Sequence, residues 1–186
     1  MFSGPDGVEF LNSYALVSYI PEPLSSFLDE LRCELVPNCF LRAHVTILPP
    51  RPLQFPAEKA WEQLRETAYN LEPVDLKLSA VEIFPQTDVI YIAIGQGQDE
   101  LKRLHGAFNN DRLAYQEPFQ YHPHITLAQN LTPDQVDELS RVAKRRWEEY
   151  DGRRTVRVET LHFVQNTRWN GWIDLAEMTL GRLVAA

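Results

Sequence analysis

The sequence predicts an α+β domain spanning residues 1–186. We expect two pseudo-symmetric lobes, with two largely antiparallel sheets facing a central cleft and helices on the outside. One supporting observation is that strand-like segments are joined by short turns, which is typical of antiparallel pairing. Another is that one order of elements occurs twice, each time around a His-x-Thr motif, with the motifs 80 positions apart. A single duplication favours two related lobes in one domain over a solenoid.

Apolar periodicity defines the elements of the first copy. Almost wholly apolar runs predict buried strands, and apolar residues spaced at i, i+3 and i+4 predict helices with one buried face. A turn containing Pro and Asp marks the end of a hairpin strand. The predicted elements, in order, are a strand at residues 14–20, a helix at 24–35, a strand at 44–48, a helix at 57–71 and a hairpin of strands 73–84 and 89–95.

The second copy follows the same order if the strand at 89–95, which ends the first hairpin, also counts as the strand that precedes it. Its clearest signal is a helix start, where Thr132 is a suitable N-cap, Pro133 stands at the first helical position and Gln135 at the third. The predicted elements, in order, are a helix near residues 98–109, a strand at 124–128, a helix from 132 to about 150 and a hairpin of strands 154–165 and 171–180.

Composition excludes several classes of protein. No apolar run approaches the roughly 20 residues that a membrane-spanning helix needs, and the N-terminal segment lacks the basic region of a secretory signal, so we expect a cytoplasmic protein. The net charge of −8 disfavours binding to duplex DNA by charge alone. We also expect a monomer. Cys33 and Cys39, the two cysteines of the chain, are too few for a disulfide framework or a four-cysteine zinc site.

The repeated motif carries the chemistry. It reads His44-Val-Thr46-Ile in the first copy and His124-Ile-Thr126-Leu in the second. Residues i and i+2 of a strand face the same way, so each segment buries its two aliphatic side chains and presents an imidazole beside a hydroxyl on the other face. If the lobes are related by a pseudo-dyad, the two His–Thr faces meet across the cleft.

Residues near the motifs are weaker candidates for substrate binding. Arg42 and His122 each lie two positions before a motif histidine, so strand alternation directs them to the same face. Phe84 and Tyr91 belong to the first hairpin and could stack on a nucleobase. The remaining histidines, His105 and His162, lie in apolar patterns and are predicted to be structural.

The motifs HVTI at 44–47 and HITL at 124–127, with their separation and the repeated helix–hairpin order, resemble the two-histidine phosphoesterase superfamily. This superfamily includes the 2′-5′ RNA ligase-like RNA cyclic phosphodiesterases, and PFQYHPHITLA at 118–128 is similar to their second motif. The resemblance implies a bilobal fold, a cleft that needs no metal or other cofactor, and hydrolysis or formation of 2′,3′-cyclic or 2′-5′ phosphodiesters. One departure is Gln129, where many ligase-like members carry a basic residue.

The same resemblance implies that His44 and His124 form the catalytic pair and that Thr46 and Thr126 bind phosphate. The chemistry agrees: opening a cyclic phosphodiester requires a base that takes a proton from water and an acid that protonates the leaving ribose oxygen. An imidazole, whose ordinary pKa is about 6.5, can do either near pH 7. The expected substrate is an RNA terminus or a small nucleotide, and the sequence leaves open which histidine is the acid.

Two alternatives remain open at this stage. His122-x-His124 resembles a metal-ligand pair that, with His44 or a carboxylate as third ligand, would make a metal-dependent hydrolase. A non-catalytic nucleotide- or RNA-binding module with the same cleft is the other, because a fold alone does not establish an activity.

Overall fold

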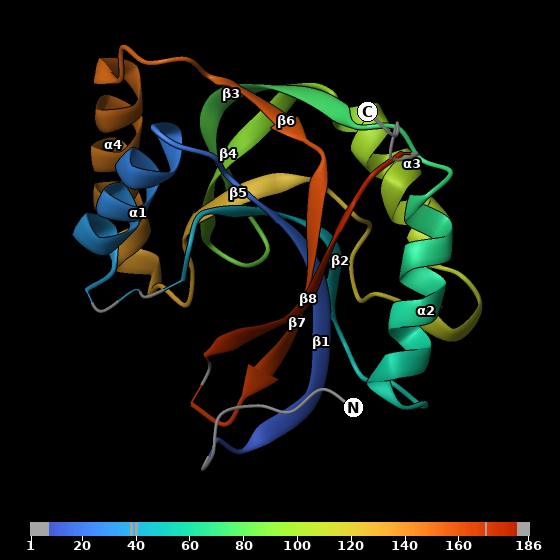
Figure 1. The fold of residues 1–186 in the computed structure, drawn as a ribbon. Helices are drawn as coiled ribbons and strands as arrows, with labels where there is room; N and C mark the ends of the chain where they lie inside the picture. Colours follow the sequence, from blue (N-terminus) through green and yellow to red (C-terminus); the bar gives the residue numbers. More distant parts are fainter. Residues whose placement is uncertain (1–7, 38, 40, 170, 182–186) are drawn as a thin grey trace.

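Two antiparallel sheets form the framework of the computed structural model, which describes residues 8–37, 39, 41–169 and 171–181 (Figure 1). In this part of the chain, each sheet has four strands. The first sheet has the order β2 (His44–Arg51), β1 (Phe10–Tyr19), β7 (Thr160–Thr167), β8 (Trp172–Thr179). The second has the order β5 (His124–Ala128), β4 (Val89–Gln96), β3 (Val74–Phe84), β6 (Thr155–Val158). The predicted α+β class with antiparallel sheets is therefore confirmed.

The helices cover the sheets in two pairs. They are α1 (Leu24–Leu35), α2 (Ala57–Ala68), α3 (Gln98–Phe108) and α4 (Pro133–Glu149), with a short 3-10 helix η1 (Asp111–Leu113). Helix α1 packs against α4 and β5, whereas α2 packs against α3 and β8, so the pairs lie on different sides of the molecule (Figure 1). None of the helices in the described residues is both long and apolar enough to cross a bilayer.

The start of α4 follows the predicted capping pattern. The side-chain oxygen of Gln135 accepts a hydrogen bond from the backbone N–H of Thr132 at 3.0 Å. Pro133 occupies the first helical position, where no N–H is needed. These contacts satisfy a backbone donor that the helix itself leaves without a partner.

Three predicted boundaries differ from the structure by three residues or more. Strand β2 continues to Arg51, past the expected residue 48, because Arg51 pairs with Tyr14 of β1. Helix α2 ends at Ala68, before the expected residue 71, because the N–H groups of Asn70 and Leu71 bond to carbonyls three residues back instead of four. Strand β1 begins earlier than expected, at Phe10, because Phe10 pairs with Thr167 of β7.

The predicted strand at 154–165 is wrong as a single element. It is divided into β6 and β7, which belong to different sheets: β6 pairs with β3, and β7 pairs with β1. The buried positions change parity at this point, from Val156 and Val158 to Leu161 and Phe163. Since side chains alternate strictly along one strand, this change of parity marks the place where the chain passes from one sheet to the other.

The lobes are not the two halves of the sequence. The hairpin β3–β4 follows the first motif in the chain but lies in the sheet of the second motif, beside β5. The hairpin β7–β8 follows the second motif but lies in the sheet of the first, beside β1 and β2. Each copy of the repeat therefore contributes its hairpin to the other motif's sheet.

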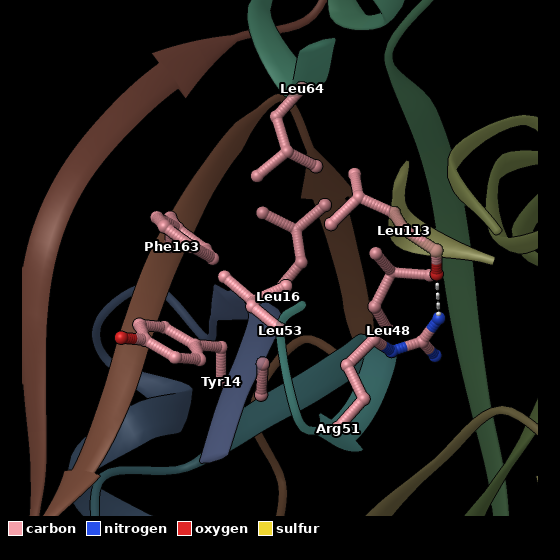
Figure 2. Close-up of a pocket in the computed structure, with 9 residues that line it drawn as sticks. Tyr14, Leu16, Leu48, Arg51, Leu53, Leu64, Leu113 and Phe163 are labelled. Atoms are coloured by element: carbon pink, nitrogen blue, oxygen red, sulfur yellow. Dashed lines mark hydrogen bonds between the residues drawn. The ribbon is translucent and has the colours of Figure 1, made fainter. Parts of the chain in front are cut away.

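The core between the first sheet and α2 is tightly packed. A gap of about 10 Å³ remains there, and Leu16, Leu64 and Phe163 are among its lining residues (Figure 2). Protein interiors have close to the packing density of organic crystals, so a gap of this size is a packing defect and not a ligand site. Arg51 lies at its edge and donates to the carbonyl of Leu113 at 2.8 Å.

Leu64→Ala tests this packing. Leu64 is fully buried, and the truncation enlarges the existing gap, so we expect the free energy of unfolding to fall by about 2–5 kcal/mol. Denaturant unfolding measures the change. Leu11→Ala is the control, because Leu11 is exposed and should cost under about 1 kcal/mol. Equal losses in both variants would contradict the assignment of Leu64 to the core.

Candidate active site

The two motifs meet because each lies on an edge strand. Strand β2 ends the first sheet and β5 ends the second, and these two edges are in contact. In the first sheet His44 pairs with Tyr19 of β1. In the second, His124 pairs with Ala93 of β4. The structure thus brings together two segments that are 80 positions apart in the chain.

Within each motif the side chains alternate as predicted. Val45 and Ile47 are fully buried, and so are Ile125 and Leu127. The histidine and threonine of each motif are half-buried and lie on the opposite face of their strand. Burial of the aliphatic pair therefore determines which face of the strand carries the imidazole and the hydroxyl.

A hydrogen bond to the backbone defines the tautomer of each motif histidine. Nδ1 of His44 lies 2.7 Å from the carbonyl oxygen of Arg42, and Nδ1 of His124 lies 2.7 Å from that of His122. A carbonyl only accepts, so Nδ1 carries the proton in both rings. Within the described residues, neither Nε2 has a hydrogen-bond partner, and the same is true of the hydroxyls of Thr46 and Thr126. These four groups are available to a ligand.

The environment of His44 favours its neutral form. Its pKa is lowered to about 4, and burial is the largest cause. The hydrogen bond to the Arg42 carbonyl acts in the opposite sense, while the positive charges of Arg32 and, when protonated, His124 contribute to the lowering. The electrostatic influence of His124 on His44 agrees with the contact between β2 and β5.

His124 is shifted in the same direction. Burial lowers its pKa, and the neighbouring His122 lowers it as well, while the hydrogen bond to the His122 carbonyl acts in the opposite sense. Without a ligand, both imidazoles are therefore neutral near pH 7. An anion bound between them would raise both pKa values, because it stabilises the charged form.

Arg32 was not among the residues predicted from the sequence. This α1 side chain is 3% exposed, its Nη2 donates to Sγ of Cys39 at 3.6 Å, and its Nε and Nη1 have no hydrogen-bond partner. Among the residues that the structure describes, no acidic side chain pairs with this guanidinium, and a buried charge without such a partner is costly. The available signal was its spacing, because Arg32 is four residues after Leu28 on the buried side of the helix.

The predicted residues Phe84, Tyr91 and His122 gather around His124. The rings of Phe84 and Tyr91 stack with centroids 4.0 Å apart. The edges of His122 and His124 meet Phe84 at 5.2 Å and 5.0 Å. Tyr91 is buried at 3% exposure, and its hydroxyl donates to Glu82 at 2.9 Å, so Phe84 is the more accessible of the two rings.

Arg42 lies on the first sheet, near His44. Its guanidinium carbon lies 3.7 Å from the centre of the Tyr19 ring, and its Nη1 lies 3.8 Å from Asp174. The Tyr19 ring also contacts His162 at 4.6 Å between centroids. The two motif histidines therefore have different neighbours: mainly aromatic rings beside His124, and a cation–π pair with a carboxylate beside His44.

The alternative of a metal site at His122 and His124 would need a third ligand, and the described residues place none there. In this part of the chain, no group of three His, Cys, Asp or Glu side chains is placed to hold a metal ion. His122, which would share such a site with His124, has a buried Nε2 without a hydrogen-bond partner.

Comparison with known proteins identifies the family of this chain. A model of the 2′-5′ RNA ligase superfamily matches residues 20–169. The chain belongs to this superfamily. A candidate phosphoesterase of Bacillus pumilus is 27% identical over 160 residues, which cover 84% of this chain and 92% of the relative. The resemblance to two-histidine phosphoesterases that the motifs predicted is thus confirmed.

Solved structures share the fold at low sequence identity. E. coli LigT in its apo form has a TM-score of 0.64 at 15% identity and covers 92% of this chain and 98% of its own. A protein of Thermus thermophilus has a TM-score of 0.60 at 16% identity, covering 92% of this chain and 100% of its own. LigT has also been solved with phosphate and with 3′-AMP.

The lowered pKa of His44 predicts a pH-dependent stability. In the unfolded chain His44 takes up a proton near its ordinary pKa of 6.5, whereas in the folded protein it does so only near pH 4. The unfolded state therefore binds more protons between these values, and the free energy of unfolding falls as the pH falls through this range. We expect His44→Gln to remove part of this fall, measured by denaturant unfolding from pH 7 to 4. An unchanged slope would contradict the shift.

Arg32→Met tests the second cause of that shift. The substitution removes the positive charge but keeps an unbranched apolar stem, so the pKa of His44 should rise towards its ordinary value. NMR titration of the His44 ring measures it. Arg103→Met on α3 is the control, because Arg103 is exposed and pairs with Glu100. The same His44 titration in both variants would rule out an effect of Arg32.

Proposed function

We propose that this protein is a metal-independent phosphodiesterase. Its substrate would be a 2′,3′-cyclic phosphate, at an RNA terminus or on a small nucleotide, or a 2′-5′ phosphodiester that it cleaves or forms. The observation that carries the proposal is the matched pair of imidazoles. His44 and His124 each have Nδ1 held by a backbone carbonyl and Nε2 without a partner. Family membership and the nucleotide complex of LigT also support a nucleotide substrate.

Hydrolysis needs two proton transfers on opposite sides of phosphorus. In our proposal, a water oxygen attacks phosphorus while Nε2 of one histidine accepts the water proton. The bond from phosphorus to one ribose oxygen breaks in line, and the other histidine, as imidazolium, protonates that oxygen. The product is a phosphomonoester, and the reverse sequence closes or joins the diester. The hydroxyls of Thr46 and Thr126 would donate to the non-bridging oxygens as their charge redistributes.

We assign the base in hydrolysis to His44 and the acid to His124. His44 has the pKa of about 4 and lies under the influence of the permanent charge of Arg32, so it holds a proton poorly. The charged group that lowers the pKa of His124 is another imidazole, His122, and not a permanently charged guanidinium. An anionic phosphate would raise the pKa of His124 and allow it to carry the proton that the leaving oxygen requires.

The flanking residues would hold the nucleoside. We assign base stacking to the outer face of Phe84, with Tyr91 supporting it from below, since the two rings are stacked. Arg42 would contact phosphate after its ion pair with Asp174 breaks. This pair is exposed, and exposed ion pairs contribute little to stability. His122 would lie at the rim, next to His124.

Substitution of the histidines tests the proposal. We expect His44→Ala and His124→Ala to reduce turnover by about 10²–10⁴ while the fold is retained. The assay uses 2′,3′-cyclic mononucleotides, cyclic-ended oligonucleotides and 2′-5′-linked dinucleotides, in chelator, with the product isomers identified. Parent turnover should follow a bell-shaped pH profile. Arg103→Ala on α3 is the control, because Arg103 is exposed and lies outside both motifs.

Other outcomes would support the alternatives. Loss of parent activity in chelator, restored by zinc or manganese, would favour a metal-dependent hydrolase. Binding of the nucleotides without turnover of any of them would favour a binding module. Near-full activity of either histidine variant would overturn the acid–base assignment.

A further inference from the structure

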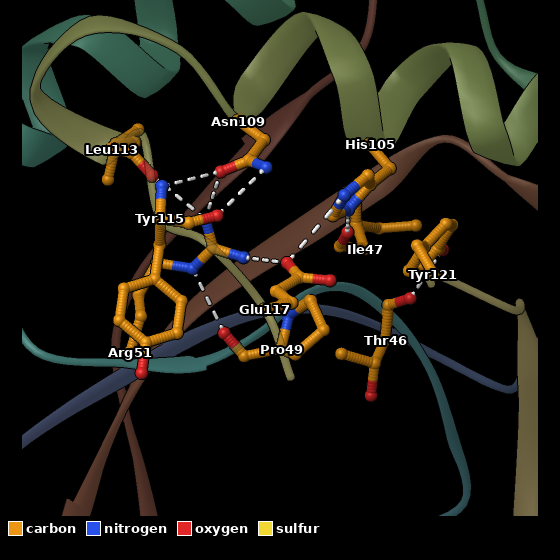
Figure 3. A network of polar contacts seen from close by, with 10 residues as sticks. All are labelled: Thr46, Ile47, Pro49, Arg51, His105, Asn109, Leu113, Tyr115, Glu117 and Tyr121. Carbon is orange, nitrogen blue, oxygen red and sulfur yellow. Dashed lines mark hydrogen bonds and ion pairs between the residues drawn. The ribbon is translucent and has the colours of Figure 1, made fainter. Parts of the chain in front are cut away.

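A polar network outside the reacting groups connects the two motifs (Figure 3). Its first member is Tyr121, which lies three residues before His124. The Tyr121 hydroxyl donates to the backbone carbonyl of Thr46, in the first motif, at 2.7 Å. The segment that leads into the second motif is thus hydrogen-bonded to the first.

Tyr121 is held in place from one side by His105. The two rings stack with centroids 4.0 Å apart and an interplanar angle of 6°. His105, on α3, also bonds through Nδ1 to the carbonyl of Ile47 at 2.9 Å. A residue that the sequence indicated to be structural therefore supports the edge of the motif strand and the tyrosine beside it.

A buried ion pair holds the segment that leads into the second motif at Glu117, four residues before Tyr121. Arg51, at the end of β2, pairs with Glu117 at 2.5 Å, and these side chains are 2% and 10% exposed. Arg51 also donates to the carbonyl of Pro49 at 3.0 Å and to the Asn109 side chain at 2.7 Å. Glu117 in turn lies 3.6 Å from Nε2 of His105. A buried pair with this many hydrogen bonds holds its geometry closely, because each unmade bond would leave a buried group unsatisfied.

The network also bonds to the backbone of β2, which is an edge strand of its sheet. The carbonyls of Thr46, Ile47 and Pro49 accept from Tyr121, His105 and Arg51. All three donors are side chains, and Tyr121 belongs to the segment that continues into β5.

The link from Tyr121 to the second motif is short and stiff. Only His122 and Pro123 separate it from His124, and three residues span at most about 10 Å. Pro123 has a fixed φ and restricts His122 to extended conformations. Burial and the nearby Glu117 raise the pKa of Tyr121, so its hydroxyl remains a donor at any physiological pH.

From this geometry we propose that Tyr121 is a positioning residue, whose hydroxyl bond to Thr46 sets the placement of the first motif's hydroxyl relative to His124. The Arg51–Glu117–His105 network holds Tyr121 for this purpose. The inference rests on the proposed function, because it assigns Tyr121 an effect on catalysis through Thr46. Misplacement of a reacting group by about 1 Å can cost roughly 100-fold in rate.

Tyr121→Phe is the direct test. It removes the hydroxyl and keeps the ring that stacks on His105, so the protein should fold with only a small decrease in Tm. We expect kcat to fall about tenfold or more while KM changes less than about twofold. Tyr115→Phe is the matched control, from the same segment, since the Tyr115 hydroxyl has no hydrogen bond within the described residues. A kcat for Tyr121→Phe equal to that of the control would overturn the proposal.

A double-mutant cycle separates positioning from general damage to the fold. Thr46→Val removes the hydroxyl that Tyr121 is proposed to position. In that background Tyr121→Phe should reduce kcat less than about threefold further, because its effect passes through Thr46. The same factor in both backgrounds would contradict a route through Thr46.

An activity-independent measurement keeps the two proposals distinguishable. The Thr46 methyl and His124 ring NMR signals should shift in Tyr121→Phe and stay unchanged in Tyr115→Phe. If these signals shift but the parent protein cleaves no phosphodiester, the proposed function fails while the link between the motifs stands. If neither signal shifts, Tyr121 does not position the site.

Discussion

The candidate active site depends on the contact between two edge strands. β2 and β5 each end a different sheet, and their contact is what brings His44 and His124 together. Neither imidazole has an acidic hydrogen-bond partner among the described residues; each is held by the carbonyl two residues before it, in the segment that leads into its strand. The geometry of each half-site is therefore local, whereas the distance between the half-sites is a property of the whole fold.

Positively charged side chains lie near His44, although the molecule as a whole is negatively charged. The chain carries a net charge of −8. Yet the buried Arg32, which has no acidic partner among the described residues, acts on His44, and Arg42 lies two residues before His44, where it pairs with Asp174. Positive charge that the protein itself does not neutralise favours an anionic ligand, and a local field of this kind can attract one in spite of the overall charge. Gln129 is uncharged, so the positive charge near His44 comes from Arg32 and Arg42.

Local pattern explains why so much of the site was predictable. Strand alternation placed Val45 and Ile47 in the core and His44 and Thr46 on the other face, because side chains of one strand must alternate. The same rule failed across residues 154–165, where the chain changes sheets and the buried parity changes with it. Arg32, Tyr121 and Glu117 were missed because their partners lie far along the chain or in another element, and no spacing rule connects them.

The sequence by itself determined most of the elements, the duplicated motif and the chemistry of the four motif side chains, since each follows from the covalent order of neighbouring residues. Only the tertiary structure decided that each hairpin joins the other motif's sheet and that Tyr121 bonds to the Thr46 carbonyl. It also decided that His44 is buried near a guanidinium. The physical reason is range: dihedral preference and side-chain period act over a few residues, but burial, hydrogen bonding across sheets and electrostatic shifts depend on which distant segments come into contact.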